Sequence, residues 1–155
     1  MGTRSITRIY DEENEIIVDI YNQYDGYVEG VGTDLINFIR SGQVLNGIQL
    51  SSGDNRRKFN GMGCFAAQLV AYWKTGAGGT YLEAPRHGNR KTVFNTHGIE
   101  YMYEVYFRKN QTNKTKEEYF RDSIEVRCFT LGDNDDIEEI DPYYYLNNGD
   151  NNDDA

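Results

Sequence analysis

The chain has 155 residues and a formal net charge of −9 at pH 7, and 14 % of its residues are aromatic, with 13 tyrosines and 7 phenylalanines. This length fits one domain, and the sequence contains neither the run of about 20 apolar residues that a membrane-spanning helix needs nor the apolar run of a signal peptide. The two cysteines, Cys64 and Cys128, make no disulfide framework. We therefore expect a cytoplasmic, non-secreted protein without membrane contact, in which both thiols are buried.

The first two segments with strand character predict a β-hairpin. Residues 5–10 alternate weakly between polar and apolar, a polar turn follows at 11–14, and residues 15–23 are rich in β-branched side chains. A glycine-rich loop then leads to Thr33, which can cap a helix that ends near Gly42.

A stronger helix is predicted for residues 62–75, because apolar side chains recur there at helical spacing. We expect it to cross the inner face of the sheet, with Trp73 largely buried at its end. Residues 76–95 are rich in glycine and basic side chains, which indicates a long loop with a short strand at 80–83. The apolar stripe of the helix comprises Met62, Phe65, Ala66, Leu69, Tyr72 and Trp73.

Two clean alternating segments, 99–108 and 123–131, predict strands that pair antiparallel, with a helical turn between them at 116–121. The order of elements gives an α+β fold with an antiparallel sheet of about four or more strands and helices packed on one face. The predicted domain comprises residues 1–131.

Residues 132–155 are expected to form a largely disordered acidic tail, because they hold nine acidic side chains, no basic ones and little apolar surface. Ile137, Ile140 and the aromatic segment 142–146 are the exception, and they can dock onto the domain or onto a partner.

Three segments carry a likeness to other proteins: MGTRSIT at 1–7, YDGY at 24–27 and GVG at 30–32. They resemble a family of short uncharacterised proteins of bacteria, tailed phages and large DNA viruses, and the likeness covers mainly the first 45 residues. It implies no particular activity. The tail, rich in asparagine and aspartate, is similar to those of viral lineages, and for a viral protein the compartment would be the host cytoplasm.

Charge is distributed unevenly along the chain. Residues 56–91, the basic stretch, hold seven basic side chains and one acidic, a charge of +6, whereas residues 1–55 carry −6 and residues 92–155 carry −9. Basic residues precede and follow the predicted helix at 62–75, whose N-terminus would favour an anion such as phosphate or a nucleotide. The alternative is two separate loops with solvated basic side chains. The candidate anion-binding residues are Arg56, Arg57, Lys58, Gly61, Gly63, Arg86, His87, Arg90 and Lys91.

The glycine-rich loop at 25–32 lacks the lysine of a phosphate-binding loop, and Asp25 and Glu29 would repel phosphate. Its glycines are explained by a sharp turn from sheet to helix. The functional alternative is that Tyr24, Asp25 and Tyr27 form an exposed surface for a protein partner.

No catalytic spacing involves the two histidines, His87 and His97, and we expect neither a metal site nor a cofactor. The leading hypothesis is a non-catalytic binding protein, such as a viral accessory factor, that captures a small anionic ligand or a protein partner. One alternative is a nucleotide-processing enzyme with His87 as acid or base, and another is a structural or virion-associated protein that acts through its tail. The acidic charge argues against nonspecific binding to duplex nucleic acid, and the abundant tyrosines are compatible with a homodimer.

Overall fold

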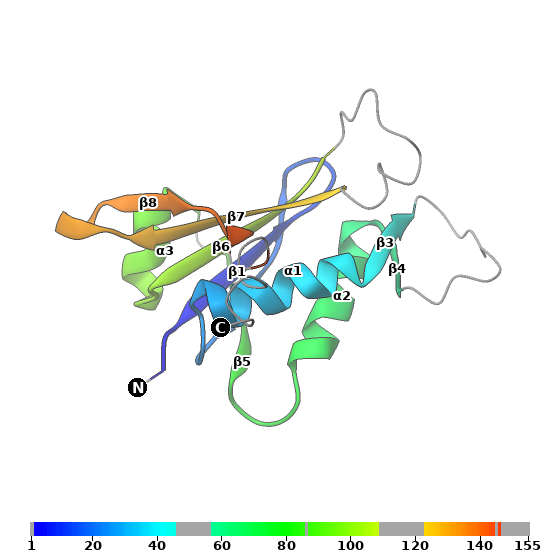
Figure 1. The fold of residues 1–155 in the computed structure, drawn as a ribbon, viewed down its shortest axis with the longest axis horizontal. Helices are drawn as coiled ribbons and strands as arrows, with labels where there is room; N and C mark the ends of the chain where they lie inside the picture. Colours follow the sequence, from blue (N-terminus) through cyan, green and yellow to red (C-terminus); the bar gives the residue numbers. More distant parts are fainter. Residues whose placement is uncertain (1, 46–56, 86, 109–122, 145, 147–155) are drawn as a thin grey trace, which may run out of the picture.

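A computed structural model describes residues 2–45, 57–85, 87–108, 123–144 and 146 (Figure 1). Its main feature is a six-stranded sheet with the strand order β5-β2-β1-β6-β7-β8. These strands are β1 (Ser5–Tyr10), β2 (Ile16–Asn22), β5 (Thr80–Glu83), β6 (Tyr101–Phe107), β7 (Ile124–Leu131) and β8 (Ile137–Ile140). Two short strands, β3 (Gly42–Leu45) and β4 (Arg57–Asn60), form a separate parallel pair.

Most neighbours in the six-stranded sheet run antiparallel, and the α+β class is therefore confirmed. The expected hairpin is β1–β2, and the expected antiparallel pair of alternating segments is β6–β7. One pairing differs from the expectation, because β1 runs parallel to β6 at the centre of the sheet. The helices between these strands return the chain to the same end of the sheet, which makes a parallel pairing possible.

In the described residues, three α-helices, one π-helical turn and a 3-10 turn, η2 (Asp133–Asp135), accompany the sheet. The π-helical turn η1 (Val28–Gly32) continues directly into α1 (Thr33–Arg40), and α2 (Gly61–Trp73) matches the stronger predicted helix. The third helix, α3 (Arg90–His97), lies where the sequence indicated a loop. No helix in the described part of the chain is long and apolar enough to cross a membrane.

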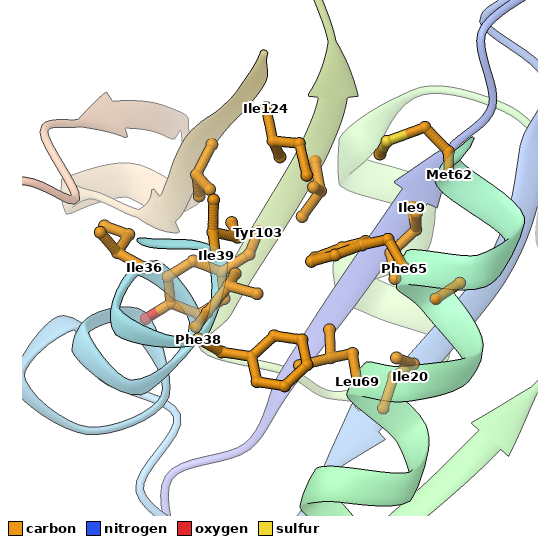
Figure 2. Close-up of a cluster of buried hydrophobic side chains, with 14 of the residues drawn as sticks. Ile9, Ile20, Ile36, Phe38, Ile39, Met62, Phe65, Leu69, Tyr103 and Ile124 are labelled. Atoms are coloured by element: carbon orange, nitrogen blue, oxygen red, sulfur yellow. The ribbon is translucent and has the colours of Figure 1, made fainter. Parts of the chain in front are cut away.

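The larger core lies between one face of the sheet and the pair α1 and α2. Figure 2 shows side chains from both helices meeting over the strands, with Phe38 of α1 pointing towards Leu69 of α2 and Phe65 of α2 lying beside Ile9. All of these side chains are buried. The part of the predicted apolar stripe from Met62 to Leu69 therefore packs as expected. Its end does not, because Tyr72 is 44 % exposed and Trp73 is only half-buried.

The second face of the sheet is covered in part by α3, so the expectation of helices on one face is wrong. Ile6, Met102 and Phe129 alternate with residues of the larger core and point to this second face. Val93 and Phe94 of α3 bury them. In Figure 1, α3 accordingly lies beside β6 and β7, away from α2.

The expected tail boundary at residue 132 also needs correction. Ile137–Ile140 forms β8, which pairs with β7 from Leu131 to Cys128. Tyr143 and Leu146 then pack against the larger core, so the aromatic segment docks onto the domain because its apolar side chains find cover there. Residues 147–155 lie outside the described residues.

Candidate functional site

The basic stretch is divided between the two faces of the sheet. Arg57 and Lys58 belong to β4, whose Phe59 is part of the larger core. Arg90 and Lys91 open α3, which covers the second face. Arg56, Arg86 and the predicted helical turn at 116–121 lie outside the described residues. Among the described residues, the candidates Arg57 and Lys58 on the one hand and Arg90 and Lys91 on the other therefore form two separate groups and not one cleft.

The predicted anion position at the start of α2 is occupied by a carboxylate of the protein itself. Glu12 Oε1 accepts a 2.6 Å hydrogen bond from the backbone N–H of Met62. Gly61 has a φ of +82°, and a Cβ built on it would lie 3.2 Å from the same Glu12 oxygen. Glu12 thus accepts from one of the N–H groups that have no partner within the helix, and its negative charge offsets the positive end of the helix dipole. An external anion would therefore find fewer hydrogen-bond donors and a weaker positive potential at this helix start.

The basic side chains near α2 also have partners within the protein. The Arg57 guanidinium lies 4.7 Å from the centre of the Phe38 ring and donates to Ser41 Oγ. Lys58 Nζ donates to Gln43 Oε1 over 3.1 Å. Gly63 is exposed and meets no atom within 4 Å of a Cβ built on it, so this position requires no glycine for close packing.

The second group of basic residues lines a groove of about 370 Å³ at the start of α3. Asn89 caps this helix by accepting from the backbone N–H of Thr92 over 2.9 Å, and Gly98 ends it with a φ of +61°. We call this the α3 groove. Its lining residues are Asn89, Arg90, Lys91, Arg127, Phe129, Ile137 and Glu139.

Two arginines in the α3 groove are each held by a carboxylate. Arg90 donates through Nε and Nη2 to Glu104, over 2.6 and 3.0 Å, and Glu104 is only 2 % exposed. Arg127 donates through the same two nitrogens to Glu139, over 2.8 and 2.7 Å. Nη1 of either guanidinium makes no hydrogen bond within the described residues, so both retain donors for a ligand.

The two guanidiniums share one aromatic platform. Arg90 Cζ lies 3.8 Å and Arg127 Cζ 5.2 Å from the centre of the Phe129 ring, which is itself buried. The hydrogen bond with Arg127 lowers the pKa of Glu139, and the bond with Glu104 raises the pKa of Arg90. The orientation of each guanidinium is therefore fixed by its carboxylate and by the ring together.

The groove carries a net positive charge despite these carboxylates. Arg90, Arg127 and Lys91 face Glu104 and Glu139, which leaves a formal charge of +1. Lys91 is exposed and has no partner within the described residues. Sequence reasoning identified Arg90 and Lys91 but missed Arg127, because only the strand register brings β7 to the start of α3.

The proposed partner surface is partly exposed. Tyr24 is exposed, Asp25 has a φ of +57°, and Tyr27 donates its hydroxyl to Asp25 Oδ1 over 3.0 Å. This bond raises the pKa of Tyr27. The glycines of the loop serve close packing as well, since a Cβ on Gly32 would lie 3.1 Å from the buried Tyr103 ring.

The remaining candidates for chemistry are isolated within the described residues. His87 is exposed and does not line the α3 groove. Cys128 is buried, which raises the pKa of its thiol to about 12, whereas Cys64 is only partly buried and accepts from Gln68 Nε2. No group of three or more histidine, cysteine, aspartate or glutamate side chains suited to a metal ion occurs in the part of the chain that the structure describes.

No family model, curated protein or solved structure matches this chain. The likeness of its first 45 residues to a family of short uncharacterised proteins therefore remains an expectation.

Proposed function

We propose that the chain is a non-catalytic binding protein that captures a small anionic ligand in the α3 groove. The observation that carries the proposal is the pair Arg90 and Arg127. Each is fixed by a carboxylate through Nε and Nη2, and the Nη1 of each makes no hydrogen bond to another described residue. A guanidinium that is already oriented loses little freedom when it binds phosphate or carboxylate oxygens.

The charge of the whole molecule favours a small ligand over a polyanion. The net charge of −9 repels a long polyanion, whereas a compact anion is attracted locally within about 10 Å at ordinary ionic strength. The half-buried Ile137 adds apolar surface to the lining of the groove. A phosphorylated or carboxylated molecule with an apolar portion, such as a nucleotide, fits this combination.

The test is calorimetric titration with pyrophosphate, a panel of mononucleotides and a dicarboxylate at low and high salt. Arg127→Gln removes one of the two guanidinium groups, and the only side chain that it leaves without its partner is the half-exposed Glu139. We expect this change to weaken binding about tenfold. Lys91→Gln should weaken binding as well, whereas Lys58→Gln, which removes the same charge on the other side of the sheet, should not. An absence of heat across the panel, or equal losses in Lys91→Gln and Lys58→Gln, would contradict the proposal.

The enzyme alternative is distinguished by the fate of the nucleotide. A binding protein returns the nucleotide unchanged, whereas a nucleotide-processing enzyme consumes it. Chromatography of a bound nucleotide after prolonged incubation separates the two hypotheses, and loss of turnover in His87→Ala would identify the histidine as acid or base.

A further inference from the structure

The α3 groove adjoins an open edge of the six-stranded sheet. Among the described residues, β8 pairs only with β7 and forms one margin of the sheet (Figure 1). The backbone N–H of Gly132 donates to the carbonyl of Asp136 over 2.7 Å, so the alternate positions 138 and 140 of the same ladder also bond to β7. The backbone N–H and C=O groups of Ile137 and Glu139 therefore point away from β7, towards the open edge.

Ile137 and Glu139 are also the two residues of β8 that line the α3 groove. Residues that lie opposite each other in a sheet have their side chains on the same face. Two residues of an added strand that pair with Ile137 and Glu139 would therefore place their side chains over the groove, beside Lys91 and Arg127. The residue between them would point to the other face of the sheet, opposite Glu138.

The two faces of the sheet differ in charge at this edge. On the side of the groove, Arg127 is paired with Glu139, and the exposed Lys91 adds a positive charge. On the other side, Glu138 is exposed and makes no hydrogen bond or ion pair with another described residue. A cavity of about 260 Å³ near the end of β8 on that side is lined in part by two more exposed carboxylates. These belong to Glu29 and Asp141.

We propose that β8 binds, as an additional antiparallel strand, an extended peptide of a partner protein in which acidic side chains alternate with a basic one. The inference rests on the proposed function, because the acidic side chains would occupy the α3 groove. Main-chain hydrogen bonds to Ile137 and Glu139 supply affinity, and the alternation of charge supplies specificity. Such a peptide has little net charge, so the −9 charge of the chain does not repel it as it repels a polyanion.

A second copy of the chain is a poorer occupant of this edge. Pairing β8 with β8 of another copy would bring the glutamates of both strands together, and like charges on neighbouring strands destabilise a sheet. The opposite margin of the sheet, β5, is partly closed. The carbonyl of Thr80 accepts from Lys74 Nζ over 2.7 Å, and the N–H of Thr80 donates to the carbonyl of Gly78 over 2.9 Å.

The test uses an acetylated and amidated peptide in which threonines flank a Glu-Lys-Glu core, titrated with the full chain in fluorescence anisotropy. We expect saturable binding with a Kd below about 1 mM. N-methylation of both glutamates removes the donors that face β8 and should weaken binding more than about tenfold. N-methylation of the lysine, whose N–H points away from β8, should leave binding nearly unchanged.

A protein variant separates the peptide from a small anion. Glu138→Gln removes a charge outside the α3 groove, so it should weaken binding of the peptide roughly threefold and leave the affinity for pyrophosphate nearly unchanged. The matched control is Glu15→Gln, the same change at an exposed residue between β1 and β2, which should alter neither affinity.

Binding of pyrophosphate without binding of the peptide up to roughly 1 mM would overturn this inference and leave the proposed function standing. Failure of both ligands would overturn both. Equal affinity of the two N-methylated peptides would show that no main-chain ladder forms on β8. A concentration-dependent dimer of the chain alone, dissociated by the peptide, would assign the edge to a second copy.

Discussion

Replacing Tyr103 by phenylalanine removes a hydrogen bond that joins the centre of the sheet to the glycine-rich loop. Tyr103 is fully buried in β6, and its hydroxyl donates to the backbone carbonyl of Gly26 over 2.7 Å. Phenylalanine has nearly the same volume, so the change leaves a buried carbonyl without its donor and creates almost no cavity. The expected loss in free energy of unfolding is about 1–3 kcal/mol. For a chain of this size, a loss of about 2 kcal/mol corresponds to a decrease in Tm of roughly 4–8 °C.

Equilibrium unfolding in urea, followed by circular dichroism and by Trp73 fluorescence, measures this loss. The matched control is Tyr24→Phe, the same change at a side chain that is 56 % exposed, which should stay within about 0.5 kcal/mol of the wild type. Hydrogen exchange gives a local readout, because the N–H of Val31 bonds to the Asp25 carbonyl beside Gly26 and should exchange faster in Tyr103→Phe. Equal stability of Tyr103→Phe and Tyr24→Phe would refute the reasoning.

Two further predictions concern pH and the acidic end of the chain. Burial raises the pKa of Tyr101, Tyr103 and Tyr143 in the folded protein, so above about pH 10 the unfolded chain loses protons that the folded chain keeps, and stability should fall as pH rises. A Tm that stays constant from pH 8 to about pH 11 would contradict this. Deletion of residues 147–155, which include three aspartates, should increase affinity for pyrophosphate more at low salt than at high salt, because a tethered polyanion competes for the groove. Calorimetry on the full chain and on the shortened chain measures the difference in affinity. Equal affinities at low salt would show that residues 147–155 do not compete with pyrophosphate.

The parts of the fold that could be predicted are those in which a periodic pattern of apolar residues extends over several turns or strand positions. The alternating residues of β6 and β7 and the apolar stripe of α2 each extend over several residues, so their type and their pairing or face follow from periodicity. In α3 only Val93 and Phe94 are buried, which is too short a stripe for periodicity to reveal. Its boundary residues, Asn89 and Gly98, are nevertheless typical of a helix start and end and were the available signal.

The candidate site was predicted less well, because its geometry depends on contacts between distant segments. Glu12 and Met62 are 50 positions apart, so nothing local indicates that a carboxylate already caps α2. Arg127 and Glu139 meet only because β8 pairs with β7. The cluster of basic residues in the sequence therefore indicated an anion site. Which basic side chains line that site depends on the order of the strands and on which of these side chains already have partners within the protein.

The parallel contact between β1 and β6 has a consequence for how the chain folds. Ser5 pairs with Tyr101, so the ribosome must synthesise most of the chain after β1 before β6 can pair with it. The β1–β2 hairpin can form as soon as its residues leave the ribosome, but the second edge of β1 stays open until β6 arrives. Such a sheet closes slowly, and the open edge can pair with another nascent chain in the meantime. Fragments that end before β6 should therefore aggregate through β1, even though their hairpin contains the longest strand pairing of the N-terminal half.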